Sequence, residues 1–421
     1  MSIERILASV SVPEVVRVEQ RFPRPVLADV AGELRERVRD SGALRRLAPG
    51  QSVALGVGSR GVSDLPLLVR TLVEEVGRVG ARPFVVPSMG SHGGATAAGQ
   101  VEVLASLGVT EANVGAPIEA TMEVREIGRT DGGLPVYLDA HAHAADAILV
   151  LNAVKPHVAF RGSYESGLVK MLAIGLGKQH GADACHDRGF GHMAENIVAS
   201  ARVTLARAPV LGAVGVVANA YGELCQIAVL PAAAVLAEEP ALLERARELA
   251  PRLPFDDLDV LVVDRMGKDI AGTGLDTNVI GRYHTPYASG GPRIARIAVL
   301  DLSERSGGNA HGIGLADVTT RRAFDKIRFE RTYPNSLTST QPATAKIPMV
   351  LEHDRQAIQA AIKTSNVLDK RHVRLVRIAS TKDLGLLEVS PSLLDEVAAQ
   401  SHLSAQGDRY ALPFDAAGRL F

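Results

Sequence analysis

Several lysine and histidine residues follow a short apolar run at residues 147–151 of the sequence. They are Lys155 and His157, then Lys170 after a glycine- and serine-bearing segment, and then His186. We interpret residues 147–151 as a buried strand of an α/β sheet, and residues just past the carboxyl end of such a strand line the ligand crevice. Imidazole exchanges protons near neutral pH, and a desolvated lysine can serve as a nucleophile or a covalent anchor.

The segment between Lys170 and His186 is rich in apolar residues, so we expect it to be largely buried. An unpaired lysine in such a place is costly, which favours a functional role for Lys170 over the alternative of a lysine that snorkels from a helix surface. Cys185 precedes His186 and could form a nucleophilic pair with it. Adjacent residues on a helix or strand point apart, however, which makes that pairing weak.

Two glycine-bearing turns precede this segment. Gly90, His92, Gly93 and Gly94 follow an apolar strand at residues 83–87 and lead into a helix, where exposed amides and the helix dipole favour a phosphate or a carboxylate. The alternative is a tight turn whose histidine caps the helix. The other turn, residues 58–61, contains Ser59 and Arg60, and its guanidinium could hold a carboxylate unless it is simply a solvated loop arginine.

These motifs resemble the core of the nickel-dependent lactate racemase family. In that family a Pro-His supplies a catalytic base, a lysine tethers a nickel-pincer nucleotide and a histidine completes the nickel coordination. The resemblance assigns these roles to His157, Lys170 and His186, and makes His92 the second catalytic histidine. It also places Arg60 at a catalytic turn, with Ser59, Gly90, Gly93 and Gly94 near the cofactor.

The resemblance further implies a racemase or epimerase that inverts C2 of a 2-hydroxy acid. Hydride transfer to the cofactor leaves a planar keto acid, and a base on each face explains the two histidines. Cofactor maturation enzymes would be partners on separate chains. Because the chain has no tryptophan, whereas the lactate enzymes use one near the substrate, a larger acid such as a sugar acid is as well supported as lactate.

The second half of the chain offers one further candidate. Gly267-Lys268-Asp269-Ile270 follows an apolar strand and resembles a Pro-Lys-Asp-Ile turn of the same family, so Lys268 could close over the substrate carboxylate. It could equally be a surface lysine. His141 and His143 would share one face of a strand and could chelate a metal, but no acidic or histidine partner accompanies them, and we interpret them as structural or exposed.

Composition excludes several classes of protein. The net charge of −1 argues against a nucleic-acid binder, and two cysteines cannot form a disulfide framework or a multi-thiolate site. We find neither a secretory signal nor an apolar run of the length of a membrane span, so we expect a cytoplasmic protein with no membrane partner. The oligomeric state stays open, a homo-oligomer included.

Strand, glycine-rich turn and helix alternate twice within residues 51–107, which predicts a doubly wound, mostly parallel α/β sheet. We place a domain boundary near a proline-bearing turn, giving an N-terminal catalytic and cofactor-binding domain at residues 1–255. A smaller α/β domain at residues 256–421 would close a cleft that holds the active site. A hairpin is expected at residues 122–138, a helical stretch interrupted by Pro240 at residues 235–253, and a long irregular polar stretch at residues 307–341.

Two other functions remain open from the sequence. A zinc-dependent hydrolase or lyase could use His92, His157 and His186 as its three protein ligands, with a water in the fourth position. A metabolite-binding homologue without turnover could retain the crevice. Bound zinc with unmodified Lys170 would favour the first, and binding without exchange of substrate hydrogen would favour the second.

Overall fold

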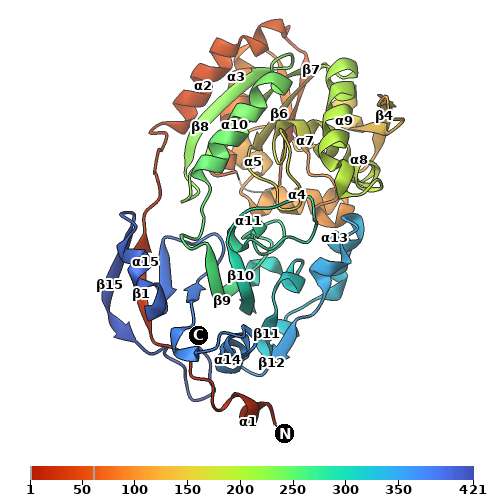
Figure 1. The fold of residues 1–421 in the computed structure, drawn as a ribbon. Helices are drawn as coiled ribbons and strands as arrows, with labels where there is room; N and C mark the ends of the chain where they lie inside the picture. The colour runs from red at the N-terminus through yellow and green to blue at the C-terminus, as the bar shows by residue number, and fades with distance from the viewer. Residues whose placement is uncertain (1, 60–61) are drawn as a thin grey trace. The chain divides into compact units, whose positions relative to one another are not determined.

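The computed structural model describes residues 2–59 and 62–421, which form two compact units (Figure 1). One unit is Pro23–Ala250, and the other joins the residues up to Phe22 with Pro251–Phe421. The division near residue 250 lies close to the expected boundary. The N-terminal segment groups with the second unit instead of the first, because β1 (Val15–Gln20) pairs with β14 (Leu386–Val389) and β15 (Leu403–Tyr410).

The Pro23–Ala250 unit is built on a five-stranded sheet in the order β3-β2-β6-β7-β8. The first four strands are parallel and only β8 runs antiparallel, which confirms the mostly parallel α/β sheet expected from the sequence. The strands are β2 (Ser52–Val57), β3 (Arg82–Pro87), β6 (Ala147–Ala153), β7 (Val210–Ala218) and β8 (Leu224–Pro231).

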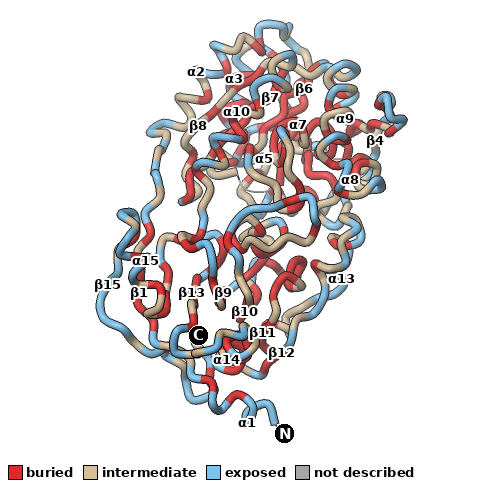
Figure 2. The backbone as a smooth tube through the Cα atoms, viewed as in Figure 1, coloured by how far each residue is buried: buried red, intermediate tan, exposed pale blue. Residues whose placement is uncertain are grey.

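Each face of this sheet buries its own core, as alternation of side chains along a strand requires. Ala54, Ile148 and Val150 point into one core, and Leu55 and Leu149 point into the other. The first core is covered by α7 (Leu168–Lys170), α9 (Met193–Arg207) and α10 (Val235–Leu249), and the second by α2 (Val30–Ser41), α3 (Leu65–Arg78) and α4 (Ala97–Ser106). The central strands are accordingly the most continuously buried part of the unit (Figure 2). Helices on both faces make the sheet doubly wound, as predicted.

The helix α10 (Val235–Leu249) runs through Pro240 instead of being interrupted there, so that expectation was wrong. Proline lacks the N–H that would bond the carbonyl four residues earlier. That carbonyl, on Leu236, instead accepts a hydrogen bond from the Tyr164 hydroxyl. The proline is therefore tolerated. The Leu236 carbonyl, which has no partner within the helix, instead connects the helix to the loop that precedes Lys170.

The other unit carries the larger sheet, eight strands in the order β12-β11-β10-β9-β13-β14-β1-β15. The strands from β12 to β13 are parallel, and the pairings beyond β13 are antiparallel. The polar stretch at residues 307–341 is not irregular as expected, since it forms β11 and helices α12 and α13. The remaining strands are β9 (Asp257–Met266), β10 (Arg293–Leu302), β11 (Val318–Thr320), β12 (Met349–Leu351) and β13 (Leu375–Ile378).

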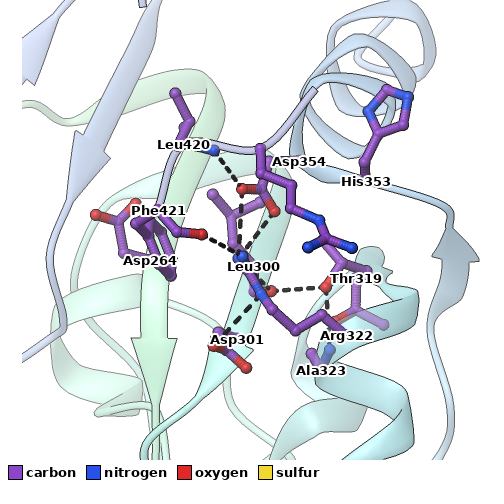
Figure 3. A network of polar contacts seen from close by, with 12 residues as sticks. Asp264, Leu300, Asp301, Thr319, Arg322, Ala323, His353, Asp354, Leu420 and Phe421 are labelled. Atoms are coloured by element: carbon purple, nitrogen blue, oxygen red, sulfur yellow. Dashed lines mark hydrogen bonds and ion pairs between the residues drawn. The ribbon is translucent and has the colours of Figure 1, made fainter. Parts of the chain in front are cut away.

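A buried network around Arg322 secures the last residues of the chain against this sheet (Figure 3). The Arg322 guanidinium lies 3.0 Å from a carboxylate oxygen of fully buried Asp354 and 3.4 Å from Asp301. It also donates to the Phe421 carbonyl and stacks on the Phe421 ring, while the Leu420 N–H donates to Asp354 at 2.7 Å. Each of these contacts is made to a residue of the same unit, so we interpret this cluster as structural.

The helices complete the two units, and in the described ranges none is both long and apolar enough to cross a lipid bilayer. The predicted hairpin is confirmed as β4 (Val124–Arg129) paired with β5 (Pro135–Asp139). The helices are α1 (Ile3–Leu7), α2 (Val30–Ser41), α3 (Leu65–Arg78), α4 (Ala97–Ser106), α5 (Glu111–Val114), α6 (Ala140–Ala144), α7 (Leu168–Lys170), α8 (Lys178–His186), α9 (Met193–Arg207), α11 (Thr277–Ile280), α12 (Arg321–Asp325), α13 (Phe329–Thr338), α14 (Asp354–Thr364) and α15 (Leu394–Ala398).

Candidate functional site

The candidate site lies at the carboxyl edge of the five-stranded sheet. Val57 of β2 is in register with Pro87 of β3 on one side and with Leu151 of β6 on the other. The loops that follow these three strands therefore leave the sheet side by side. The chain order also reverses across β2, because β3 lies on one side of it and β6 on the other, and such a switch point is where doubly wound sheets bind ligands.

Lys170 and His157 meet in this region. The Lys170 Nζ lies 2.7 Å from the His157 Nε2, and burial lowers the pKa of Lys170 to about 8 although part of the side chain stays exposed. Lys170 ends α7 and is followed at once by a π-helical turn, η3 (Met171–Gly175). Turns of this kind are rare and frequently occur at functional sites. The sequence-based expectation of a desolvated lysine thus agrees with its surroundings.

A buried carboxylate that the sequence did not single out fixes the loop between His157 and Lys170. Glu165 accepts a hydrogen bond from the His157 backbone N–H at 2.5 Å and forms an ion pair with Arg247 at 2.6 Å. Its side chain is fully buried, and Arg161 lies 3.6 Å away on the other side. Because Arg247 belongs to α10, the pair ties the His157 backbone to a distant helix.

A second buried carboxylate, Glu239, lies at the start of α7. It accepts the Val169 N–H at 2.7 Å, and burial raises the pKa of its carboxyl group to about 7. The Glu239 Oε1 has no hydrogen-bond partner among the described residues, and a Cβ at Gly167 would come within 2.0 Å of it. Gly167 is therefore required for Glu239 to reach the helix that carries Lys170.

His186 is the last residue of α8, and its ring packs edge-on against Phe190 with centroids 5.2 Å apart. The Nδ1 is buried and has no hydrogen-bond partner among the described residues. Burial, and then the charge of nearby Lys170, lowers the pKa of His186 to about 4. A neutral imidazole with an unengaged nitrogen is the form that binds a metal ion.

Cys185 takes no part in a nucleophilic pair. Its thiol is buried, and burial raises its pKa to about 11. A thiol with such a pKa stays protonated at neutral pH, whereas the thiolate is the nucleophile and the metal ligand. The weak Cys-His pairing considered from the sequence is thus disfavoured.

The glycine-rich turn packs against the π-helical turn. The Gly90 N–H donates to the Gly175 carbonyl at 3.3 Å, and a Cβ at Gly90 would lie 3.2 Å from Ile174 and 3.8 Å from Ala182 of α8. The turn therefore borders the segments that carry Lys170 and His186. Glycine is required here on conformational grounds, because Gly90, Gly93 and Gly94 have φ values of 60°, 67° and 66°.

His92 occupies this turn, and its Nδ1 is hydrogen-bonded to the hydroxyl of Ser59 at the end of β2. If the Nδ1 carries the proton and donates it to Ser59, the Nε2 is left as an acceptor. The following helix, α4, is capped by the Thr96 hydroxyl, which accepts the Gly99 N–H at 3.1 Å. Because Thr96 already binds an N–H group of the first turn of α4, an anion at this site would bind to the N–H groups of the glycine-rich turn.

A buried ion pair between Lys178 and Asp139 is linked to the glycine-rich turn by hydrogen bonds. Lys178 has no exposed surface, lies 3.0 Å from Asp139, and donates to Gln100 at 2.9 Å and to the Pro87 carbonyl. Gln100 in turn donates to the Gly90 carbonyl at 2.8 Å. Sequence reasoning missed this network because its members lie on three separate elements. The available signal was a second lysine in the apolar segment after Lys170.

The sequence also predicted Arg60 and Lys268 as site residues. Arg60 falls outside the described residues. Lys268 belongs to the other unit, after β9, where its ammonium donates to the Gly272 carbonyl at 2.5 Å. The pKa of His284 in the same unit is lowered to about 4 by burial and then by the charge of Lys268. The cleft between domains stays a prediction.

The described residues do not form a metal site made of protein side chains alone. Within residues 2–59 and 62–421 there is no group of three or more His, Cys, Asp or Glu side chains placed to hold a metal ion. The ligand set of the zinc alternative is thus not formed. His141 and His143 lie on the helix α6 and not on a strand, so they do not share a face, and His141 lies 3.4 Å from Glu119.

Comparison with known proteins adds little to this geometry. No protein-family model matches the chain, and no curated protein matches it. Among solved structures, the lactate racemase apoprotein from Thermoanaerobacterium thermosaccharolyticum aligns over 80% of this chain and 87% of its own, with a TM-score of 0.48 and 13% identity. A likeness of this size does not assign an activity, which must be argued from the residues of the site.

Proposed function

We propose that this protein is a racemase or epimerase that inverts the C2 centre of a 2-hydroxy acid with a nickel-pincer nucleotide as cofactor. The observation that supports it best is the pairing of two unusual groups on consecutive elements. Lys170 is a desolvated amine, and nearby His186 keeps a buried ring nitrogen that has no hydrogen-bond partner among the described residues. One group suits covalent attachment and the other suits a metal.

The residues present fit such a cofactor. Lys170 would carry it covalently and His186 would supply one nickel ligand. Ser59, Gly90, Gly93 and Gly94 are the proposed lining of the cofactor site, and of these Gly90 packs against the segment between Lys170 and His186. Because no group of three or more protein ligands is placed for a metal in the described ranges, the other ligands would have to come from the cofactor. When bound, the group would supply reversible hydride acceptance from C2 of the substrate. Separate maturation enzymes would deliver it.

The histidines would move the hydroxyl proton. One turnover requires one group that accepts a proton from the substrate oxygen and another that donates one on the opposite face. His92 can accept at Nε2 when its Nδ1–H is donated to Ser59. His157 accepts the Ala159 N–H at its Nδ1, at 3.1 Å, so its own proton resides on Nε2. That N–H would donate to the substrate once the Lys170 nitrogen, 2.7 Å away, carries the cofactor and no longer accepts it. Reaction of the other enantiomer would exchange the two roles.

The substrate carboxylate would be held by cationic side chains, for which Arg60 and Lys268 are the proposed residues. Guanidinium and ammonium groups bind carboxylates by charge-assisted hydrogen bonds. This part of the proposal comes from the sequence. It also leaves the size of the acid open between lactate and larger sugar acids.

The test is an isotope experiment on protein produced in cells that synthesise the pincer nucleotide. Enantiomerically pure 2-hydroxy acids and sugar acids, deuterated at C2, would be incubated with the protein and analysed by chiral chromatography and mass spectrometry. We expect inversion of at least one acid with the deuterium retained. Loss of the deuterium to water would indicate proton abstraction from carbon. No inversion of any acid by cofactor-loaded protein would contradict the proposed activity.

A further inference from the structure

The contacts of the His157 ring determine which atom carries its proton. The Ala159 backbone N–H donates to the Nδ1 at 3.1 Å, so this nitrogen is an acceptor and has no proton. Since a neutral imidazole carries one proton, that proton is on the Nε2. The imidazolium form is excluded by the same contact, because both of its nitrogens are donors.

The Nε2 proton in turn determines the state of Lys170. The Nζ lies 2.7 Å from the Nε2, within hydrogen-bonding distance. An ammonium group has only donors, and two donors facing each other cannot form a hydrogen bond. A free amine has a lone pair and accepts the Nε2 proton. The two contacts of His157 are satisfied together only if Lys170 is neutral.

The surroundings favour the same state. Lys170 ends a short helix whose other residues, Leu168 and Val169, belong to the hydrophobic core, and an ammonium group beside this core loses part of its hydration. The nearby Lys155 adds a second positive charge that disfavours protonation. The loop itself cannot turn His157 away easily, because Glu165 holds the His157 backbone N–H at 2.5 Å.

We propose that His157 is a positioning residue that stabilises the free, nucleophilic amine form of Lys170 relative to the ammonium form in the cofactor-free protein. The purpose of this arrangement rests on the proposed function, since an amine must lose its proton before it can attack an electrophilic carbon of an incoming cofactor. The ligand class is therefore a molecule with an acyl carbon that carries a leaving group. The Lys170 nitrogen forms the new C–N bond, the bond between that carbon and the leaving group breaks, and the leaving group departs with the proton that the nitrogen loses. His157 becomes available to the substrate only once the lysine nitrogen has been acylated and no longer accepts its proton.

The experiment measures amine reactivity on the cofactor-free protein. Lysines would be labelled with trace acetic anhydride between pH 5.5 and 10, and the peptides quantified by mass spectrometry, with exposed Lys382 as internal reference. We expect the labelling of Lys170 to reach half its maximum at or below pH 8. In His157→Asn, whose side-chain oxygen can still accept the Ala159 N–H, we expect the free-amine fraction at pH 7 to fall by about tenfold, a change of one unit in pKa.

His141→Asn is the matched control, because His141 is exposed and pairs with Glu119. It should leave the Lys170 profile unchanged. A Lys170 midpoint near pH 10, or the same midpoint in wild type and His157→Asn, would overturn the proposal. If His157→Asn does not fold, the nitrogen chemical shifts of His157 in the wild-type protein decide the question, because a protonated Nδ1 excludes the mechanism. A nickel adduct formed without enhanced reactivity would remove this inference alone and leave the proposed function intact.

Discussion

Replacing Glu239 by glutamine should make the protein less sensitive to rising pH. Glu239 is fully buried and its Oε2 accepts the Val169 N–H, while its other oxygen has no partner among the described residues. Glutamine can keep the accepting oxygen in place and put its amide nitrogen where the unpaired oxygen lies. It thus imitates the protonated acid and cannot ionise.

The magnitude follows from the pKa of Glu239. Burial raises it from the ordinary value of 4.5 to about 7, so the folded state binds the proton more tightly than the unfolded state. The stabilisation from the neutral acid is complete below pH 4.5 and is lost as the pH rises to 7. At about 1.4 kcal/mol for each pH unit, this loss amounts to about 3 kcal/mol in the wild type. The glutamine side chain does not titrate, so the variant does not undergo this loss of stability.

The assay is urea unfolding of both proteins at a series of pH values from 5 to 8.5, followed by circular dichroism. The difference in free energy of unfolding between Glu239→Gln and wild type removes the contribution of all other titrating groups. We expect this difference to move by about 2.5 kcal/mol in favour of the variant between the two ends of the range, since part of the loss already occurs below pH 5. A difference that stays constant with pH would refute the argument that Glu239 is forced to ionise in a buried site.

Two further substitutions test the packing that positions the site. Gly167→Ala would place a Cβ 2.0 Å from the Glu239 Oε1 and should destabilise the protein by about 1–3 kcal/mol in urea unfolding. The control is Gly77→Ala, at a helical glycine with open space around it, which should be neutral or stabilising. Equal effects of the two substitutions would contradict the contact between residue 167 and Glu239. Lys178→Met would leave Asp139 buried without its ion-pair partner and should cost about 3–5 kcal/mol, much of which Lys178→Met combined with Asp139→Asn should restore. No recovery in the double variant would argue against the pair as the cause.

The sequence predicted elements best where local pattern and burial agree. The hairpin expected at residues 122–138 forms β4 and β5, and the buried strand expected at residues 147–151 lies within β6. The strand β1 could not be placed in this way, because its partners β14 and β15 lie at the far end of the chain. Pairing between distant segments leaves no periodic signal in either of them.

The candidate site shows the same division. His157, Lys170 and His186 were proposed from residue type and spacing, and the turn of Gly90 from its glycines. The groups that hold them were not found, since Glu165 and Arg247 are 82 positions apart and neither stands out locally. The π-helical turn after Lys170 was equally hidden, because its apolar sequence fits an ordinary helix. Residues that react have recognisable types, whereas residues that position them are defined by three-dimensional contacts.

The central claim, a nickel-bearing nucleotide on Lys170 with His186 as a metal ligand, is tested most directly by intact mass and nickel content. The wild-type protein, Lys170→Arg and His186→Ala would be purified from cells that synthesise the pincer nucleotide. We predict an added cofactor mass and about one nickel per chain in the wild type, no adduct in Lys170→Arg, and loss of nickel in His186→Ala. A wild-type protein with neither adduct nor nickel, or variants that retain both, would contradict the account.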